Sequence, residues 1–232
     1  MTMFGAMRKG AWCSAVLLAT TLLAPGSEAA PRQTQPRAIV AVDPAVTLAN
    51  RADSYLRAGE LLPPSDRATA FYRQALDLAQ QALELDPTSA RANFVYFAAK
   101  GRLLMIEGTA RNVIALKNLR PYLDRALKTD PDYPDALAAK GGMLLELPNY
   151  LGGDSRQAEQ VLQRAVQVFP GGPATRLLYA KALLQNGKLT AAHEQLRRAA
   201  HYASVQRRYL VLVDAQKLMR QVDSEIARNS SR

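Results

Sequence analysis

Apolar residues recur along the chain at the spacing of one face of a helix. Four segments share a pattern in which an Ala or Leu is followed four residues later by another, and three residues after that by an Ala. Steps of four and three residues keep such side chains on one stripe of an α-helix. The pattern predicts four helices that bury a narrow face of small side chains: Ala75/Ala79/Ala82, Leu119/Leu123/Ala126, Ala158/Leu162/Ala165 and Ala192/Leu196/Ala199.

A proline lies five residues after the stripe in three of these segments, at Pro87, Pro131 and Pro170, and Ser204 takes its place in the fourth. Proline stops a helix and sets the turn into the next one. A pair of helices joined in this way cannot bury its apolar stripe alone, so successive pairs must stack. We therefore predict an all-α fold, a solenoid of stacked antiparallel helical hairpins over residues 44–204.

This spacing resembles the tetratricopeptide repeat (TPR) family, and the resemblance covers about residues 44–204. The unit 173–204 matches best, with Tyr179 and Ala180 at a large-then-small pair and Gly187 at the turn between its helices. The resemblance implies a scaffold that binds a protein or peptide partner in a concave groove, and not an enzyme.

Two spacings exceed the 34-residue period of the family. Pro87 and Pro131 are 44 residues apart, which predicts longer helices or an extra turn in 88–130, and Pro121 predicts a kink or a new segment there. Pro131 and Pro170 are 39 residues apart, and the five added residues, PNYLG at 148–152, lie within the turn LPNYLGGD at 147–154. In that turn we expect Asp154 or Ser155 to cap the next helix.

The LPxxLGGD turn is similar to one in exported bacterial TPR proteins, among them the T-component, an accessory lipoprotein of some TRAP transporters. These relatives imply an exported subgroup that binds rather than catalyses.

The two ends of the chain carry different signals. Arg8 and Lys9 precede an apolar run over residues 11–24, which is too short to span a bilayer and is typical of a secretory signal peptide. We expect a signal peptide over 1–30, a flexible linker over 31–43, and export, most simply to the periplasm. At the other end we expect a capping helix over 205–228, with a membrane-surface or partner-binding helix as the alternative, and a disordered tail over 229–232.

The net charge and the positions of the histidines limit the classes of partner and site that we expect. The net charge is +10, or about +9 without residues 1–30. For an exported chain this favours an acidic partner or at most a peripheral contact with anionic lipid over nucleic acid, and a merely solvated basic surface is the simplest explanation. The only histidines, His193 and His201, are eight residues apart, about 12 Å along a helix, which is too far to share a metal. We expect no catalytic site, no metal and no cofactor.

The groove of the predicted solenoid would be lined by the first helix of each hairpin. In the family's register the candidates for a partner-binding groove are Arg91, Phe94, Val95, Asp135, Leu177 and Lys181. Core packing is the alternative for the apolar members. The favoured occupant is a protein or peptide, and the alternative is a small apolar ligand carried by an accessory protein of transport or envelope assembly.

Overall fold

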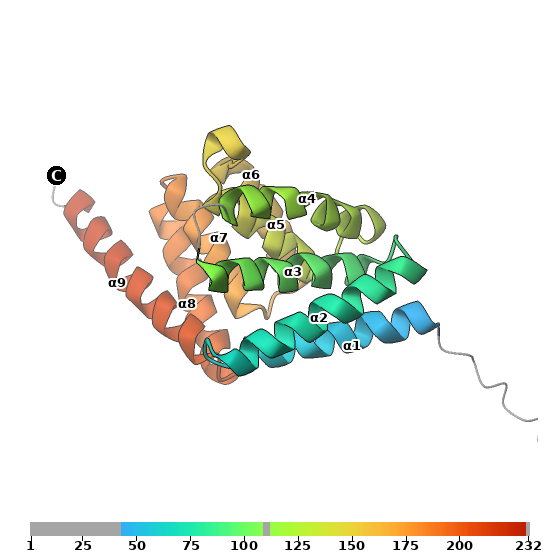
Figure 1. The fold of residues 1–232 in the computed structure, drawn as a ribbon. Coiled ribbons are helices and arrows are strands. Elements are labelled where there is room, and N and C mark those ends of the chain that lie inside the picture. The colour runs from blue at the N-terminus through green and yellow to red at the C-terminus, as the bar shows by residue number, and fades with distance from the viewer. Residues whose placement is uncertain (1–42, 109–111, 231–232) are drawn as a thin grey trace, which may run out of the picture. The chain divides into compact units, whose positions relative to one another are not determined.

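The computed structural model describes residues 43–108 and 112–230 (Figure 1). The predicted signal peptide and all of the predicted linker except Asp43 lie outside the described residues. The helices are α1 Pro44–Glu60, α2 Asp66–Leu85, α3 Ala90–Glu107, α4 Asn112–Thr129, α5 Pro134–Glu146, a 3-10 turn η1 Asn149–Leu151, α6 Ser155–Val168, α7 Pro173–Gln185, α8 Leu189–Val205 and α9 Tyr209–Ser230.

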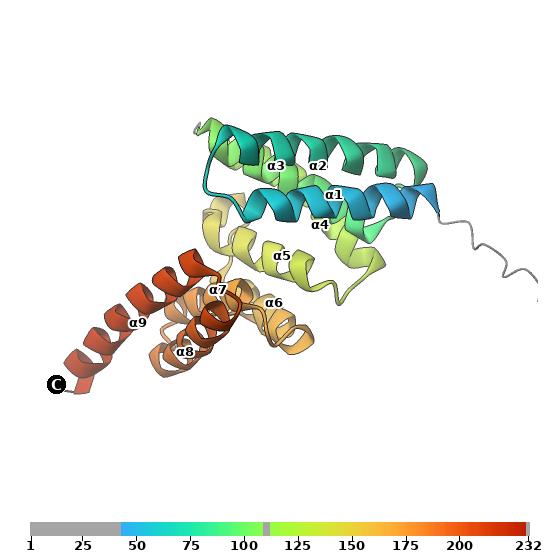
Figure 2. The same ribbon diagram turned by 90° about the horizontal axis from the view of Figure 1, so that it is seen from below.

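The helices pack as consecutive hairpins. The pairs α1–α2, α3–α4, α5–α6 and α7–α8 each contact along their length, and α9 packs on α8 and α7. Figure 2 shows the antiparallel course of α1 and α2. Over the described residues all regular structure is helical, which confirms the predicted all-α solenoid of stacked hairpins. No helix in this part of the chain is both long and apolar enough to cross a membrane.

The predicted stripes form the contact faces of the second helices. All twelve stripe residues are buried, and eleven of them have no exposed surface. Small residues on the first helices let these faces approach closely. A Cβ atom at Gly59 would meet the ring of Tyr72 at 2.6 Å, and one at Gly141 would lie 2.3 Å from Cγ of Leu162. The helix pairs are therefore closer than any larger side chain would allow.

A repeated hydrogen bond joins the turns along one edge of the array. In three successive repeats the acceptor belongs to the residue directly after the proline of the turn. The donor is a side chain near the end of the second helix of the hairpin that follows this turn. The pairs, donor first, are Thr129–Thr88 at 2.8 Å, Arg164–Asp132 at 2.8 Å and Gln206–Gly171 at 2.7 Å. These bonds set the spacing of neighbouring turns.

The two insertions have different structures. The first is absorbed by longer helices, since α3 and α4 have 18 residues each, and α4 continues through Pro121 rather than starting a new segment. The second forms η1 and a glycine turn, in which Gly152 has φ 94° and is left-handed. The Asp154 side chain accepts from the backbone N–H groups of Arg156 and Gln157, which confirms the predicted cap of α6.

The C-terminal boundaries differ from the prediction. Residue 205 does not begin the last helix, because α8 continues through Val205 and the left-handed Arg207 (φ 55°) ends it. Helix α9 begins at Tyr209 and extends to Ser230, so the first two residues of the predicted tail are helical and the last two lie outside the described residues. Ala215 and Val222 bury the inner face of α9.

Candidate functional site

Polar side chains from three first helices meet at one surface. Arg57 of α1 donates to Asp53 on the same helix and to Asp135 at the start of α5, each at 3.0 Å. Arg91 of α3 donates to the side-chain oxygen of Asn50 of α1. Tyr133, just before α5, completes the group that we call the α1–α3–α5 cluster: Asn50, Asp53, Arg57, Arg91, Tyr133 and Asp135.

Packing positions Tyr133 within this cluster. Its ring meets the buried ring of Phe94 edge to face, with centroids 5.1 Å apart. Beside the cluster, an open cleft of about 360 Å³ is lined by Asn50 and Arg91 together with Val46, Ala49 and Ser89. Arg91 is exposed, and its guanidinium is therefore accessible from the cleft side.

The charges and burial within the cluster keep Arg57 and Tyr133 protonated, so both remain hydrogen-bond donors. The hydrogen bond and charge of Asp53, joined by the charge of Asp135, raise the pKa of Arg57 although partial burial opposes this. Burial, reinforced by the Asp53 and Asp135 carboxylates, raises the pKa of Tyr133 well above its usual value, so its hydroxyl stays protonated. Among the described residues, the buried Oδ1 atom of Asp53 has no hydrogen-bond partner. Because this oxygen is buried, an acceptor for an outside donor comes instead from the partly exposed Asp135 carboxylate.

The structure brings together only some of the predicted groove residues. Arg91 and Asp135 belong to the α1–α3–α5 cluster, and Phe94 lies beneath Tyr133. Val95 has no exposed surface and Leu177 is 6% exposed, and these two belong to different core clusters. The core-packing interpretation therefore accounts for Phe94, Val95 and Leu177, whereas Lys181 is half-buried on α7, a helix that contributes no residue to the cluster.

Sequence reasoning missed most of this cluster. Helix α1 carries Asn50, Asp53 and Arg57. It lies before the first predicted stripe and its proline, so the spacing of the later repeats could not be used to assign these residues to the groove. Tyr133 follows Asp130 and lies among acidic residues that are typical of helix caps. The sequence feature that could have identified Tyr133 is its position directly before Pro134, the proline that begins α5.

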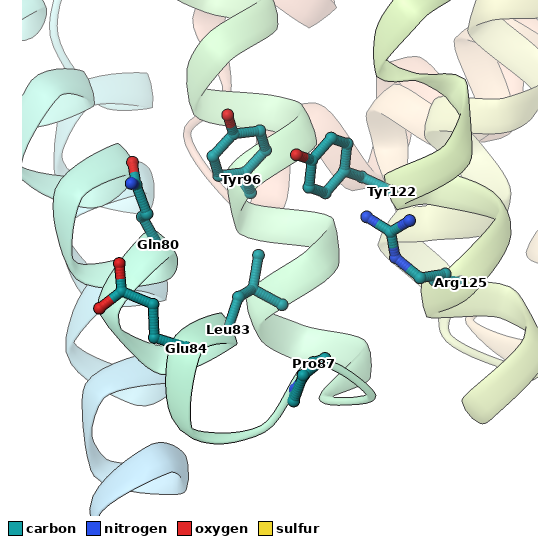
Figure 3. Close-up of a pocket in the computed structure, with 7 residues that line it drawn as sticks. All are labelled: Gln80, Leu83, Glu84, Pro87, Tyr96, Tyr122 and Arg125. Atoms are coloured by element: carbon teal, nitrogen blue, oxygen red, sulfur yellow. The ribbon is translucent and has the colours of Figure 1, made fainter.

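A second cleft opens between α2 and α4, over α3 (Figure 3). Tyr96 of α3 and Tyr122 of α4 stack with centroids 4.2 Å apart, and the guanidinium carbon of Arg125 lies 4.4 Å from the Tyr122 ring centroid. The opposite wall comes from α2 and the turn after it. This tyrosine cleft has a volume of about 420 Å³ and is lined by Gln80, Leu83, Glu84, Pro87, Tyr96, Tyr122 and Arg125.

A buried asparagine connects two parts of the tyrosine cleft, the turn at Pro87 and the side chain of Arg125. Asn93 is fully buried, and its amide donates to the carbonyls of Pro87 and Ser89 at 2.9 Å each. Its side-chain oxygen accepts from Nε of Arg125 at 2.9 Å. Burial, followed by the hydrogen bond with Tyr122, raises the pKa of Tyr96. The cleft offers aromatic stacking faces and hydroxyl groups, which suit binding.

The histidines have structural partners. Nε2 of His193 lies 3.0 Å from Oδ1 of Asp223, which joins α8 to α9, and His201 meets the ring of Tyr202 edge to face. In the described part of the chain no group of three His, Cys, Asp or Glu side chains is placed to hold a metal ion.

Two family models match different parts of the chain. Residues 43–143 match the model described as regulator of microtubule dynamics protein 1-3, and residues 152–215 match a tetratricopeptide repeat model. The second match supports the predicted TPR resemblance over α6 to α8 and the start of α9. No curated protein matches the sequence.

The solved structures that match this chain have low sequence identity to it. They include pilF of Pseudomonas aeruginosa (20% identity, TM-score 0.47, covering 76% of this chain and 78% of that one) and TTC0263, a thermophilic TPR protein in Thermus thermophilus (19%, 0.46, 73% and 94%). A third is YrrB, a TPR protein with an unusual peptide-binding site (21%, 0.37, 72% and 92%). None of these matches identifies a partner for this chain.

Proposed function

We propose that this TPR-type scaffold is exported to the cell envelope and binds an extended segment of a protein partner on the α1–α3–α5 cluster. The observation that carries the proposal is the convergence of polar groups that are far apart in sequence. Arg91 meets Asn50 across 41 residues, and Arg57 meets Asp135 across 78 residues. Such a surface exists only in the folded array.

The groups of the cluster complement a peptide main chain. An extended segment presents N–H donors and C=O acceptors that need partners when they leave water. The exposed Arg91 guanidinium offers donors to a carbonyl or carboxylate, and the Asp135 carboxylate, whose side chain is 43% exposed, offers acceptors to an amide or ammonium group. The adjoining cleft of about 360 Å³ has room for a side chain between Val46 and Ser89.

A crosslinking experiment tests the binding surface. A photoreactive amino acid at position 91 is expected to capture a partner in the host cell, and mass spectrometry identifies the captured segment. With that segment as a synthetic peptide, Arg91→Glu is expected to weaken binding at least about tenfold, because a donor becomes an acceptor of opposite charge. Arg73→Glu, an exposed position on α2, is the matched control. Equal affinities of the two variants for the peptide would contradict the proposal.

Export needs its own test. It is supported by the basic pair Arg8–Lys9 and the 14-residue apolar run at 11–24. Fractionation of the host followed by intact-mass measurement is expected to find, outside the cytoplasm, a chain that begins at about residue 30. A full-length chain retained in the cytoplasm would contradict it.

The structure does not favour the small apolar ligand. The walls of both described clefts carry charged side chains, with Arg91 at one and Glu84 and Arg125 at the other. An apolar molecule in either cleft would remove these charged groups from water without offering them a new partner.

A further inference from the structure

The positive charge of the chain is concentrated in its second half. Between Gln160 and Val213 there are eight Lys or Arg residues and a single acidic residue, Glu194, a net charge of +7 out of +10 for the whole sequence. Glu194 is itself paired, since Arg197 and Arg198 donate to it at 3.0 and 2.6 Å. Helices α6 to α8 and the start of α9 therefore form a strongly basic part of the array.

Large apolar side chains are exposed within this basic part. They lie where α6 ends and where α8 passes into α9, and we call them the apolar edge. The members and their exposed fractions are Val168 38%, Phe169 50%, Val205 69%, Tyr209 72%, Leu210 72% and Val213 40%.

These residues lie at the helix ends that flank two turns, and the two turns are held together. Nε2 of Gln206, in the α8–α9 turn, donates to the carbonyl of Gly171, in the α6–α7 turn, at 2.7 Å. Phe169 lies two residues before Gly171, and Leu210 lies four residues after Gln206. The exposed aromatic and aliphatic groups therefore face solvent from neighbouring turns of one edge, rather than being scattered singly over the surface.

Two arginines flank the apolar edge without acidic partners. Arg207 occupies the tip of the α8–α9 turn and is exposed, and Arg208 follows it and is half-buried. In the described residues neither forms an ion pair with a carboxylate, and no Asp or Glu occurs from Gln195 to Val213. Their charge is thus available to an anion.

We propose that this edge docks on an anionic lipid surface. Phe169, Tyr209 and Leu210 enter the headgroup region, where aromatic and aliphatic side chains gain from leaving water, and Arg207 and Arg208 meet lipid phosphates. An acidic protein would account for the charge but not for apolar groups that project from turns. A second copy of the chain would account for the apolar groups but would bring two basic regions together. The lipid surface satisfies both observations, and the contact is peripheral.

Vesicle sedimentation tests the proposal. The chain from residue 31 is suitable because the described residues, 43–108 and 112–230, belong to one compact unit. It is expected to sediment with vesicles of phosphatidylglycerol and phosphatidylcholine, to remain in solution with phosphatidylcholine alone, and to be released as salt shortens the screening length. Arg207→Glu with Arg208→Glu is expected to weaken binding roughly 30-fold or more. Tyr209→Ser with Leu210→Ser is expected to weaken it at least about tenfold.

Matched controls exist elsewhere on the surface. Arg51→Glu with Arg73→Glu produces the same change of net charge on α1 and α2, and Tyr150→Ser removes an aromatic ring that is 84% exposed on η1. Both controls are expected to bind vesicles within about twofold of the starting chain. Losses as large as those of the edge variants would overturn the proposal, and so would the absence of binding to the anionic vesicles.

Two further outcomes would assign the edge to another occupant and overturn the proposal. One is a dimer, seen by analytical ultracentrifugation, that Tyr209→Ser with Leu210→Ser dissociates. The other is binding to polyglutamate that equals vesicle binding and is unchanged by those apolar substitutions. Circular dichroism of every variant excludes unfolding as the cause of a loss.

Discussion

Gly153 approaches the carbonyl of Leu147 so closely that a Cβ atom on Gly153 would lie 1.7 Å from the carbonyl oxygen. This approach brings the backbone N–H of Asp154 to the carbonyl of Leu144, at 3.0 Å, and places the Asp154 side chain at the N-terminus of α6. The glycine turn therefore connects α5 to the cap of the next helix.

Gly153→Ala is expected to lower the free energy of unfolding by about 3 kcal/mol, because backbone must move to make room for the methyl group. Urea denaturation followed by circular dichroism measures the change. Gly142→Ala is the control, since its Cβ would lie 3.6 Å from Cδ1 of Leu178 and the helix gains up to about 1 kcal/mol from alanine. Equal losses at both positions would show that the contact with Leu147 is unimportant.

Gly141 and Leu162 are expected to be energetically coupled. Gly141→Ala places a methyl group 2.3 Å from Cγ of Leu162 and should cost about 2 kcal/mol. Leu162→Ala should cost about 2 to 5 kcal/mol through the space it leaves. The double variant should lose at least about 1 kcal/mol less than the two single losses combined, because the new methyl group occupies part of that space. Additive losses would contradict a direct contact.

Arg176 is the most deeply buried charged residue of the described chain, with 4% exposure. Its Nε atom donates to the carbonyl of Pro170 at 2.8 Å, and a terminal nitrogen donates to Oε1 of Gln195 at 2.7 Å. Burial is the main cause that lowers its pKa. Arg176→Met is expected to reduce the free energy of unfolding by about 2 to 3 kcal/mol, because two acceptors lose their donor. A neutral result in urea denaturation would show that water replaces the guanidinium.

Tyr133 should make stability depend on alkaline pH. Its folded-state pKa is raised by burial and by the Asp53 and Asp135 carboxylates, so its contribution is complete below the unfolded value near 10 and is lost as the pH rises further. Tyr133→Phe is expected to reduce the loss of stability above pH 10, measured by urea denaturation at stepped pH. The ultraviolet titration of the folded protein should also lose its latest-ionising tyrosine. An unchanged alkaline profile would contradict this assignment.

The sequence was most informative where a residue's role depends on its own helix. The spacing of Ala158, Leu162 and Ala165 predicted a buried stripe, and all three are fully buried. The turn at Asp154 was predictable because capping is a local interaction. Such features follow from periods of three and four residues and need no knowledge of the neighbouring repeat.

Contacts between repeats were not accessible in the same way. Tyr96 and Tyr122 are 26 residues apart, and their stacking depends on how α3 crosses α4. Asn93 and Arg176 are polar and yet buried, because the carbonyls of Pro87 and Pro170, six residues earlier, accept their hydrogen bonds. A sequence pattern that assigns polar residues to the surface places both on the wrong side of the helix.

The bonds from Thr129, Arg164 and Gln206 to the preceding turns have a mechanical consequence. They hold neighbouring turns together on that side of the array. At the other ends of the helices the α7–α8 connection is bonded to α6 as well, since Asn186 donates to the carbonyl of Ser155 at 3.0 Å and Lys188 donates to Glu159 at 2.6 Å. A pulling force would therefore have to break polar contacts at both ends of these helices before it parted α6 from the α7–α8 hairpin.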